Sequence, residues 1–101
     1  SDDPDDFRFA YNQTIILSGS RDTKNGKLKL KLMAEHSPSF STFLGSFDGV
    51  DYREAGGAIE WNLKPGLNTF WARIKTSAGW LGPASSIKVL YKPPLHIGKP
   101  L

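Results

Sequence analysis

The chain has no cysteine and only two histidines, His36 and His96, among its 101 residues. Without cysteine it can form neither a disulfide framework nor a zinc site with thiolate ligands. Two histidines also leave little scope for metal or acid–base chemistry that depends on imidazole. A chain of 11.2 kDa is nevertheless long enough to bury one hydrophobic core without covalent cross-links, so we expect a single folded domain.

Long hydrophobic runs are also missing. No apolar run exceeds three residues, as in Ile15–Leu17, whereas a membrane-spanning helix needs about 20. No segment has the pattern of a signal peptide. With 39% hydrophobic and 23% charged residues, the composition excludes both an integral membrane protein and a disordered tail. We therefore expect no membrane contact by this chain.

The charge is unevenly distributed along the sequence. The formal net charge is +3, but four of the ten acidic residues lie in residues 1–6, and the other six face 13 basic residues in 7–101. The acidic run is typical of a solvated leader or inter-domain linker. Residues 93–101 contain three prolines, which favour an extended connector or tail. We expect a module at 7–92, flanked by these linkers and taken from a longer protein.

A period of two in the hydrophobic pattern runs through most of the chain. It is clearest at 27–36, where Leu28, Leu30, Leu32 and Ala34 alternate with lysine and other residues. A strand places these four side chains on one face, whereas a helix would scatter them. This segment is therefore predicted to be a half-buried β-strand.

Turn signals separate further strand candidates along the chain. Asp48-Gly49 is typical of a two-residue hairpin, and Gly56-Gly57 and Pro65-Gly66 mark further breaks. The expected strands are 7–11, 14–18, 27–36, 41–47, 50–54, 58–63, 67–76 and 85–91. About seven short strands without a helical period predict an all-β fold, an antiparallel two-sheet β-sandwich.

Two segments carry a resemblance to a known class of domain. Residues 63–91, LKPGLNTFWARIKTSAGWLGPASSIKVLY, and the hairpin at 46–52 resemble bacterial immunoglobulin-like and fibronectin type III-like modules of multidomain exported proteins. The chain also resembles the sandwich domain that follows sensor propellers in some bacterial regulators. The resemblance implies a secreted, periplasmic or cell-surface location, and neighbouring domains of the parent chain as partners.

The sequence departs from the fibronectin type III pattern before the penultimate strand. These modules usually have a tyrosine there, whereas this chain has Asn68-Thr69-Phe70. Phe70 can fill the core but has no hydroxyl group to tie the loop. We expect the Asn68 side chain to bond the backbone of the turn instead. This favours a bacterial immunoglobulin-like variant.

Motifs for catalysis, metal binding and phosphate binding are weak or absent. Neither histidine is placed with a serine and a carboxylate as a nucleophilic triad requires. The acidic side chains Glu35, Glu54 and Glu60 fall on different expected strands, which gives no basis for a carboxylate pair. Gly26-Lys27 does not fit a phosphate-binding loop, because no serine or threonine follows and a strand comes next. We therefore expect no enzyme, no catalytic or metal-ligating residue and no cofactor.

Outward aromatic and basic side chains are the remaining candidates for binding. If Phe70 faces the core, Trp71 and Arg73 face solvent. Trp80 lies in the loop between the last two expected strands, and Tyr52 follows the Asp48-Gly49 hairpin. Aromatic rings can stack on sugar rings, and cations can meet acidic polysaccharide. The alternative is that Trp71 packs under an adjacent element or a neighbouring domain.

A second surface candidate is the row formed by Lys27, Lys29 and Lys31. These lysines could attract polyanions, but a solvated strand face commonly carries lysine for solubility. No nucleic-acid-binding motif supports the first interpretation, and no nucleic-acid partner is expected.

Taken together, these features predict a non-catalytic structural or docking module of a larger secreted or surface protein, related to carbohydrate-active proteins or adhesins and monomeric when isolated. One alternative is a carbohydrate-binding module that stacks polysaccharide on Trp71, Trp80 and Tyr52, beside Arg73. The other is a dimerising sandwich beside a sensor propeller.

Overall fold

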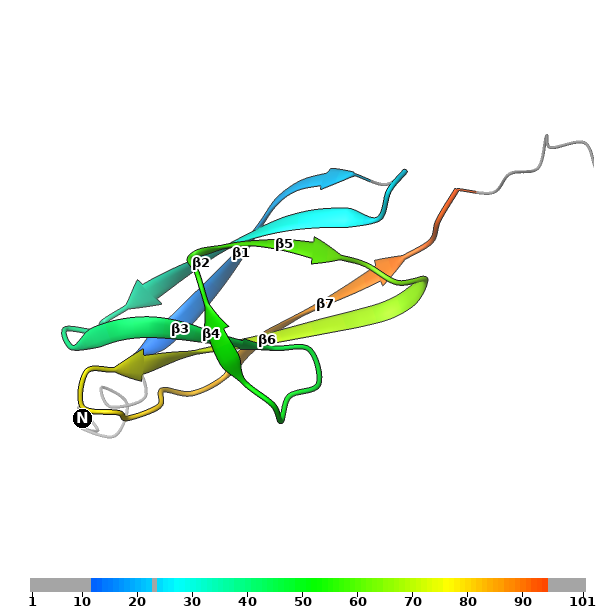
Figure 1. Ribbon diagram of the computed structural model, residues 1–101. Helices are drawn as coiled ribbons and strands as arrows, with labels where there is room; N and C mark the ends of the chain where they lie inside the picture. Colours follow the sequence, from blue (N-terminus) through cyan, green and yellow to red (C-terminus); the bar gives the residue numbers. More distant parts are fainter. Residues whose placement is uncertain (1–11, 23, 95–101) are drawn as a thin grey trace, which may run out of the picture.

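The computed structural model describes residues 12–22 and 24–94, and in this part of the chain all regular structure is β-strand (Figure 1). The seven strands are β1 (Gln13–Asp22), β2 (Lys27–Glu35), β3 (Phe40–Ser46), β4 (Arg53–Ala55), β5 (Ala58–Asn62), β6 (Gly66–Thr76) and β7 (Ser85–Tyr91). They form a three-stranded sheet in the order β1-β2-β5 and a four-stranded sheet in the order β4-β3-β6-β7. All pairings are antiparallel. The predicted two-sheet β-sandwich is confirmed.

Most predicted strands agree with the structure, but one hairpin differs. β3 and β4 are antiparallel neighbours, as expected, yet residues 47–52 connect them, so Asp48-Gly49 is not a two-residue turn. The connection is longer because the side chain of Asp48 organises a wider loop. The first predicted strand, 7–11, the linker at 1–6 and most of the linker at 93–101, from residue 95 on, lie outside the described residues.

The alternating pattern of β2 has the predicted consequence over most of its length. Leu28, Leu30 and Leu32 are buried, and the intervening lysines are exposed. Ala34 was expected on the buried face but is exposed, so that prediction is wrong. Ala34 pairs with Thr14 at the start of β1, and β5 pairs with β2 only as far as Lys31. The third strand therefore ends before it reaches this end of β2.

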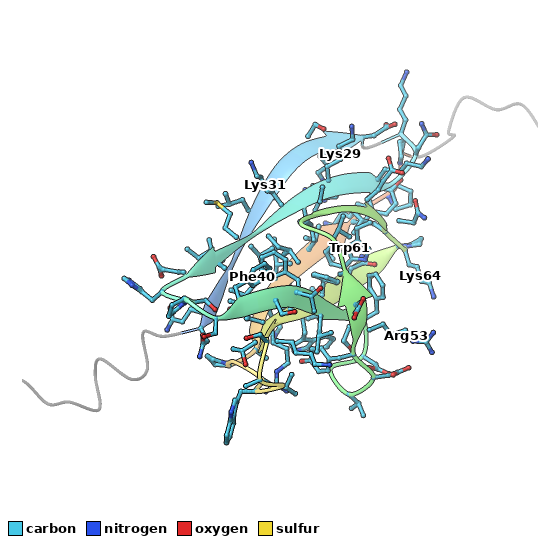
Figure 2. All side chains as sticks on the ribbon, turned by 60° about the vertical axis from the view of Figure 1, so that its left-hand side comes forward. Lys29, Lys31, Phe40, Arg53, Trp61 and Lys64 are labelled. Atoms are coloured by element: carbon cyan, nitrogen blue, oxygen red, sulfur yellow. The ribbon has the colours of Figure 1, made fainter. Side chains whose placement is uncertain are left out.

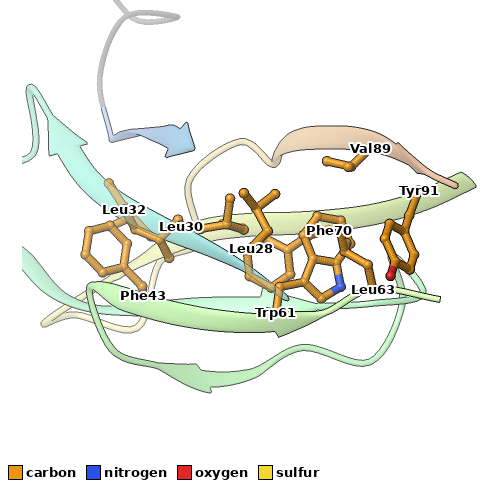
Figure 3. Close-up of a cluster of buried hydrophobic side chains, with 11 residues drawn as sticks. Leu28, Leu30, Leu32, Phe43, Trp61, Leu63, Phe70, Val89 and Tyr91 are labelled. Carbon is orange, nitrogen blue, oxygen red and sulfur yellow. The ribbon is translucent and has the colours of Figure 1, made fainter. Parts of the chain in front are cut away.

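The hydrophobic core lies between the two sheets (Figure 3). On β6, Phe70, Ala72 and Ile74 are at most 1% exposed, as their spacing predicted. The rest of the core consists of Leu28, Leu30, Leu32, Phe43, Trp61, Leu63, Val89 and Tyr91. Burying an apolar side chain of this size contributes about 1.5–3 kcal/mol relative to leaving it exposed. The alternating strands thus supply one continuous interior.

The turn between β5 and β6 is held by Asn68, as predicted. Its Oδ1 accepts a hydrogen bond from the Lys64 backbone N–H at 2.8 Å. Its Nδ2 donates to the carbonyl groups of Lys64 at 2.8 Å and Gly66 at 3.0 Å. It also lies 3.3 Å from the Val89 carbonyl on β7. One amide therefore satisfies the turn and links it to the neighbouring strand, a function that a tyrosine would otherwise have.

Candidate interaction surface

Trp71 and Arg73 lie on the outer face of the four-stranded sheet, as the alternation of β6 predicted. Their neighbours Phe70, Ala72 and Ile74 point into the core. Trp71 pairs with Ser46 of β3 and with Ser86 of β7, so it lies in the middle of the sheet. Both side chains are, however, only partly exposed, because other parts of the chain cover them.

The loop between β3 and β4 covers one side of Trp71. A Cβ atom added to Gly49 would lie 3.2 Å from the indole atoms Cε2 and Cζ2, so the backbone of the loop rests close to the ring. Gly49 has φ +80°, a conformation that glycine adopts without steric cost. Ser46, paired with Trp71 in the sheet, is 1% exposed. Trp71 therefore packs under an adjacent element of its own chain, which was the alternative interpretation of its position.

Two side chains hold this loop in place. The Ser46 hydroxyl accepts hydrogen bonds from the backbone N–H groups of Asp48 and Gly49 and donates to the Asp48 carboxylate. The same carboxylate oxygen accepts the N–H groups of Val50 and Asp51, both at 2.8 Å. These bonds, first the one from Asp51, lower the pKa of Asp48 to about 2, because they favour the charged form. The loop over Trp71 is therefore ordered by charge-assisted hydrogen bonds.

Arg73 joins three parts of the chain. Its guanidinium carbon lies 5.4 Å from the centre of the Tyr52 ring, within the range of a cation–π interaction. Its Nε donates to the Gly82 carbonyl at 2.9 Å, in the loop before β7. The structure thus brings Tyr52, Trp71 and Arg73 to one sheet face, but Arg73 and Tyr52 already bind each other.

Trp80 does not join this group. Its backbone pairs with Thr76, five residues beyond Trp71 on β6, which corresponds to about 17 Å along a strand. Its side chain is 74% exposed. Together with Asn12 and Pro38 it lines a shallow cavity of about 240 Å³. The proposed binding residues therefore fall into two places, Trp71, Tyr52 and Arg73 on the sheet face, and Trp80 in a loop at one end of the sandwich.

The sequence interpretation missed Phe47. Its ring lies 5.3 Å from Phe70 and 6.2 Å from Trp61, measured between ring centres, yet it is 62% exposed. It lines two neighbouring cavities of about 620 and 520 Å³. The available signal was that Phe47 follows the inward-facing Gly45 at an even spacing, which places it on the core side. That it stays uncovered was not predictable from this spacing.

The lysine row lies on the outer face of the three-stranded sheet, where Figure 2 shows Lys29 and Lys31 projecting away from the core. Lys27 pairs with Asp22 on β1, and Lys29 pairs with Glu60 on β5. Opposite charges at paired positions partly compensate each other. The surface is therefore less positive than the sequence of β2 alone indicates, which favours a solvated strand face over a site for polyanions.

Within residues 12–22 and 24–94, no three side chains of histidine, aspartate or glutamate come together as a possible metal site. The same described residues contain no helix that is long and apolar enough to cross a membrane. No protein-family model, curated protein or solved structure matches this chain.

Proposed function

We propose that this chain is a non-catalytic spacer and docking module of a larger secreted or surface protein, of the immunoglobulin-like and fibronectin type III-like kind that its sequence resembles. The observation that carries the proposal is that the described chain begins and ends at opposite ends of the sandwich (Figure 1). A unit of this form holds the domains before and after it at a fixed separation.

The strands fix this separation. The Ser85 hydroxyl at the start of β7 donates to the Thr14 carbonyl near the start of β1. The seven residues of β7 then carry the chain about 20 Å to the opposite end, where Tyr91 pairs with Gly66. The two ends are thus joined by continuous strands and cannot approach each other without unfolding.

The strand order also supports the fibronectin type III-like part of the resemblance. β4 pairs with β3 and extends the four-stranded sheet. In a constant-type immunoglobulin domain, the fourth strand instead lies beside the fifth in the other sheet. This chain therefore differs from the constant-type arrangement in the place of its fourth strand.

Trp80 supplies the docking surface in this proposal. It lies at the end of the sandwich where β1 begins, as its shared cavity with Asn12 shows. Its neighbour Leu81 is 47% exposed. A large exposed aromatic residue at this place can bury its ring against a preceding domain, and tryptophan is enriched in such contacts. Trp71 is less suited to this role because the chain's own loop already covers it.

The spacer property is tested by placing the chain between two fluorescent proteins and measuring energy transfer. We expect one transfer efficiency that stays constant with salt and changes only when the domain unfolds. A glycine–serine linker with the same number of residues is the control, and its efficiency should vary with solvent conditions. A sandwich fusion that behaves like this linker would contradict the spacer function.

Docking is tested in the natural full-length protein through the fluorescence of Trp80. In a Trp71→Phe background, acrylamide should quench the emission less in the full-length protein than in the isolated chain, because a neighbouring domain covers the ring. Trp80→Phe in the same background identifies the contribution of the remaining tryptophans. Equal quenching of Trp80 in both proteins would show that the ring is not at an interface.

The alternative of a carbohydrate-binding platform receives less support from the arrangement of the aromatic residues. Trp80 contacts Thr76, which lies about 17 Å along β6 from Trp71. Tyr52 is held by Arg73. A polysaccharide pull-down with Trp71→Ala as the comparison separates the two functions, since specific loss of binding in this variant would favour the platform.

A further inference from the structure

The side of the sandwich between β4 and β5 is open. Each of these strands lies at the edge of its sheet, β4 beside β3 and β5 beside β2. They are joined through Gly56 and Gly57, so their free edges flank the same opening. An edge strand has backbone N–H and C=O groups that can pair with a further strand.

The opening contains the two cavities that meet at Phe47. The larger one, about 620 Å³, is lined along β5 by Ala58, Ile59 and Glu60. The smaller one, about 520 Å³, is lined along β5 by Glu60, Trp61 and Asn62. Along β5, the larger cavity is thus centred on Ile59 and the smaller one on Trp61. These positions are two residues apart, which corresponds to about 7 Å in a strand. This is the spacing at which an extended chain places successive side chains on one face.

Four acidic and two basic residues line the two cavities of the opening. The acidic residues are Asp48, Asp51, Glu54 and Glu60. The basic residues are Arg53, whose guanidinium group lies 3.2 Å from the Asp51 carboxylate, and Lys64 at the smaller cavity. Apart from Lys64, residues 12–46 and 61–94 contain nine lysine and arginine residues but two acidic ones. The opening is therefore a negative region on an otherwise positive molecule, and it is complementary to a basic partner.

β5 already pairs with a strand of suitable chemistry on its other side. β2 alternates leucine and lysine, with its leucines in the core and Lys29 paired with Glu60. An added strand that alternates apolar and basic residues in the same way could form equivalent interactions at the free edge of β5. Its apolar side chains would point toward Ile59 and Trp61, and its basic side chains would lie on the side of Glu60.

We propose that the free edge of β5 binds an extended segment of a partner polypeptide in which apolar and basic residues alternate, as a fourth strand of the β1-β2-β5 sheet. Two apolar side chains of the segment occupy the cavities on either side of Phe47. Its basic side chains pair with Glu60 and the neighbouring carboxylates. Backbone pairing provides affinity in this mode of recognition, and the side-chain pockets provide specificity. The inference is independent of the spacer function, which depends on the ends of the sandwich.

The experiment is a titration of the isotope-labelled chain with a synthetic peptide in which lysine and valine alternate over about seven residues. We expect saturable shifts of backbone amide signals in residues 47–62, largest along β5. A peptide of the same composition with lysine and valine in blocks is one control, and a peptide in which glutamate and valine alternate is the other. Neither should reproduce the shifts, because the first lacks the alternation and the second repels the carboxylates.

Matched variants test the charges. Replacing Glu54 and Glu60 together by glutamine should weaken peptide binding about two- to thirtyfold at low salt, since each exposed ion pair contributes about 0.2–1 kcal/mol and about 1.4 kcal/mol corresponds to tenfold. Glu35→Gln removes one exposed carboxylate outside the opening and should leave the affinity unchanged. Thermal unfolding of each variant confirms that the sandwich is intact.

Four results would overturn the proposal. The first is the absence of saturable binding up to millimolar peptide. The second is equal binding of the block or glutamate peptide. The third is a set of shifts centred on β7 or on the outer sheet faces. The fourth is concentration-dependent dimerisation of the chain through residues 47–62 without peptide, which would identify a second copy as the occupant.

Discussion

Phe70 and Phe47 belong to one aromatic cluster, with ring centres 5.3 Å apart, but they lie in different regions of the sandwich. Phe70 is in the middle of the long strand β6, with a strand on either side and the other sheet above it, and is 1% exposed. Phe47 follows the last residue of β3 and lies at the open side, where it is 62% exposed. Position relative to the sheet edges, not residue type, separates the closed region from the open one.

This comparison shows where stability and recognition reside in the fold. The closed region, around β2 and β6, consists of side chains that alternate in and out of a continuous core. The open region, around Phe47 and β5, has a core-like wall that no strand covers. Substitutions in the closed region should therefore affect stability most, and those in the open region should affect surface properties.

The largest effect is expected from Phe70→Ala. Removal of a fully buried phenylalanine ring leaves a cavity and typically costs about 3–5 kcal/mol. Phe70→Leu, which keeps more of the volume, should cost clearly less. The measurement is urea unfolding followed by far-ultraviolet circular dichroism. A loss below about 1 kcal/mol for the alanine variant would mean that this region is not closely packed.

Asn68→Ala should have the next largest effect, because Asn68 lies where the closed region meets the open side. Its side-chain amide forms hydrogen bonds with the Lys64 N–H and C=O groups and with the Gly66 carbonyl. Loss of these bonds should cost about 1–3 kcal/mol, since each typically contributes about 0.5–1.5 kcal/mol and the exposed groups of Lys64 can bond to water instead. Asn68→Asp keeps the acceptor but loses the donor, and its unfolding midpoint should lie between those of the alanine variant and the unmodified chain. Equal midpoints for all three would contradict the role given to this amide.

Phe47→Ala tests the open region directly. The substitution removes the ring contacts with Phe70 and Trp61, but much of the ring is already in water, so we expect a loss of about 0.5–1.5 kcal/mol. Trp61 emission should shift to longer wavelength as water reaches the indole, measured in a Trp71→Phe and Trp80→Phe background. A stability loss as large as that of Phe70→Ala would remove the distinction between the two regions.

The smallest effect concerns the pH dependence of the loop over Trp71. Since the folded pKa of Asp48 is lowered to about 2 from an ordinary value near 3.8, its contribution to stability is present above about pH 4 and is lost as the pH falls toward 2. Comparison of urea midpoints at about pH 5 and about pH 2.5 measures this loss. Asp48→Asn should reduce the difference.

This pH dependence should not disappear entirely in Asp48→Asn. The pKa of Asp22 is also lowered, first by a hydrogen bond from the Asn25 side chain, so this carboxyl also contributes stability that is lost as the pH falls through its lowered pKa. Asp22→Asn should reduce it further. An unchanged pH dependence in the Asp48 variant would show that the hydrogen bonds of the loop do not persist in solution.

The strands and the core were largely predictable from the sequence because their signal is local. Alternation alone assigns Leu28, Phe70 and Ile74 to the interior. The same reasoning failed at Ala34, whose alternation is intact but which lies beyond the reach of β5. It also failed at Asp48-Gly49, where side-chain hydrogen bonds produced a six-residue loop.

The candidate site was predictable only in part. The outward direction of Trp71 and Arg73 follows from their place on β6. That Gly49 covers Trp71 and that Tyr52 stacks on Arg73 depends on the path of the β3–β4 loop across the sheet. The separation of Trp80 from this group depends on the length of β6, which continues to Thr76.

The local pattern of residues is enough to specify strands with one apolar and one polar face, because the two directions of successive side chains are a property of the extended backbone. Which faces and edges remain uncovered depends on how the two sheets pack and where their strands end. Coverage depends on segments far apart in the chain, such as the four-stranded sheet that lies against Leu28 and the gap that β4 and β5 leave beside Phe47. A local pattern has no information about such distant partners, and for that reason the open side of the sandwich became visible only in three dimensions.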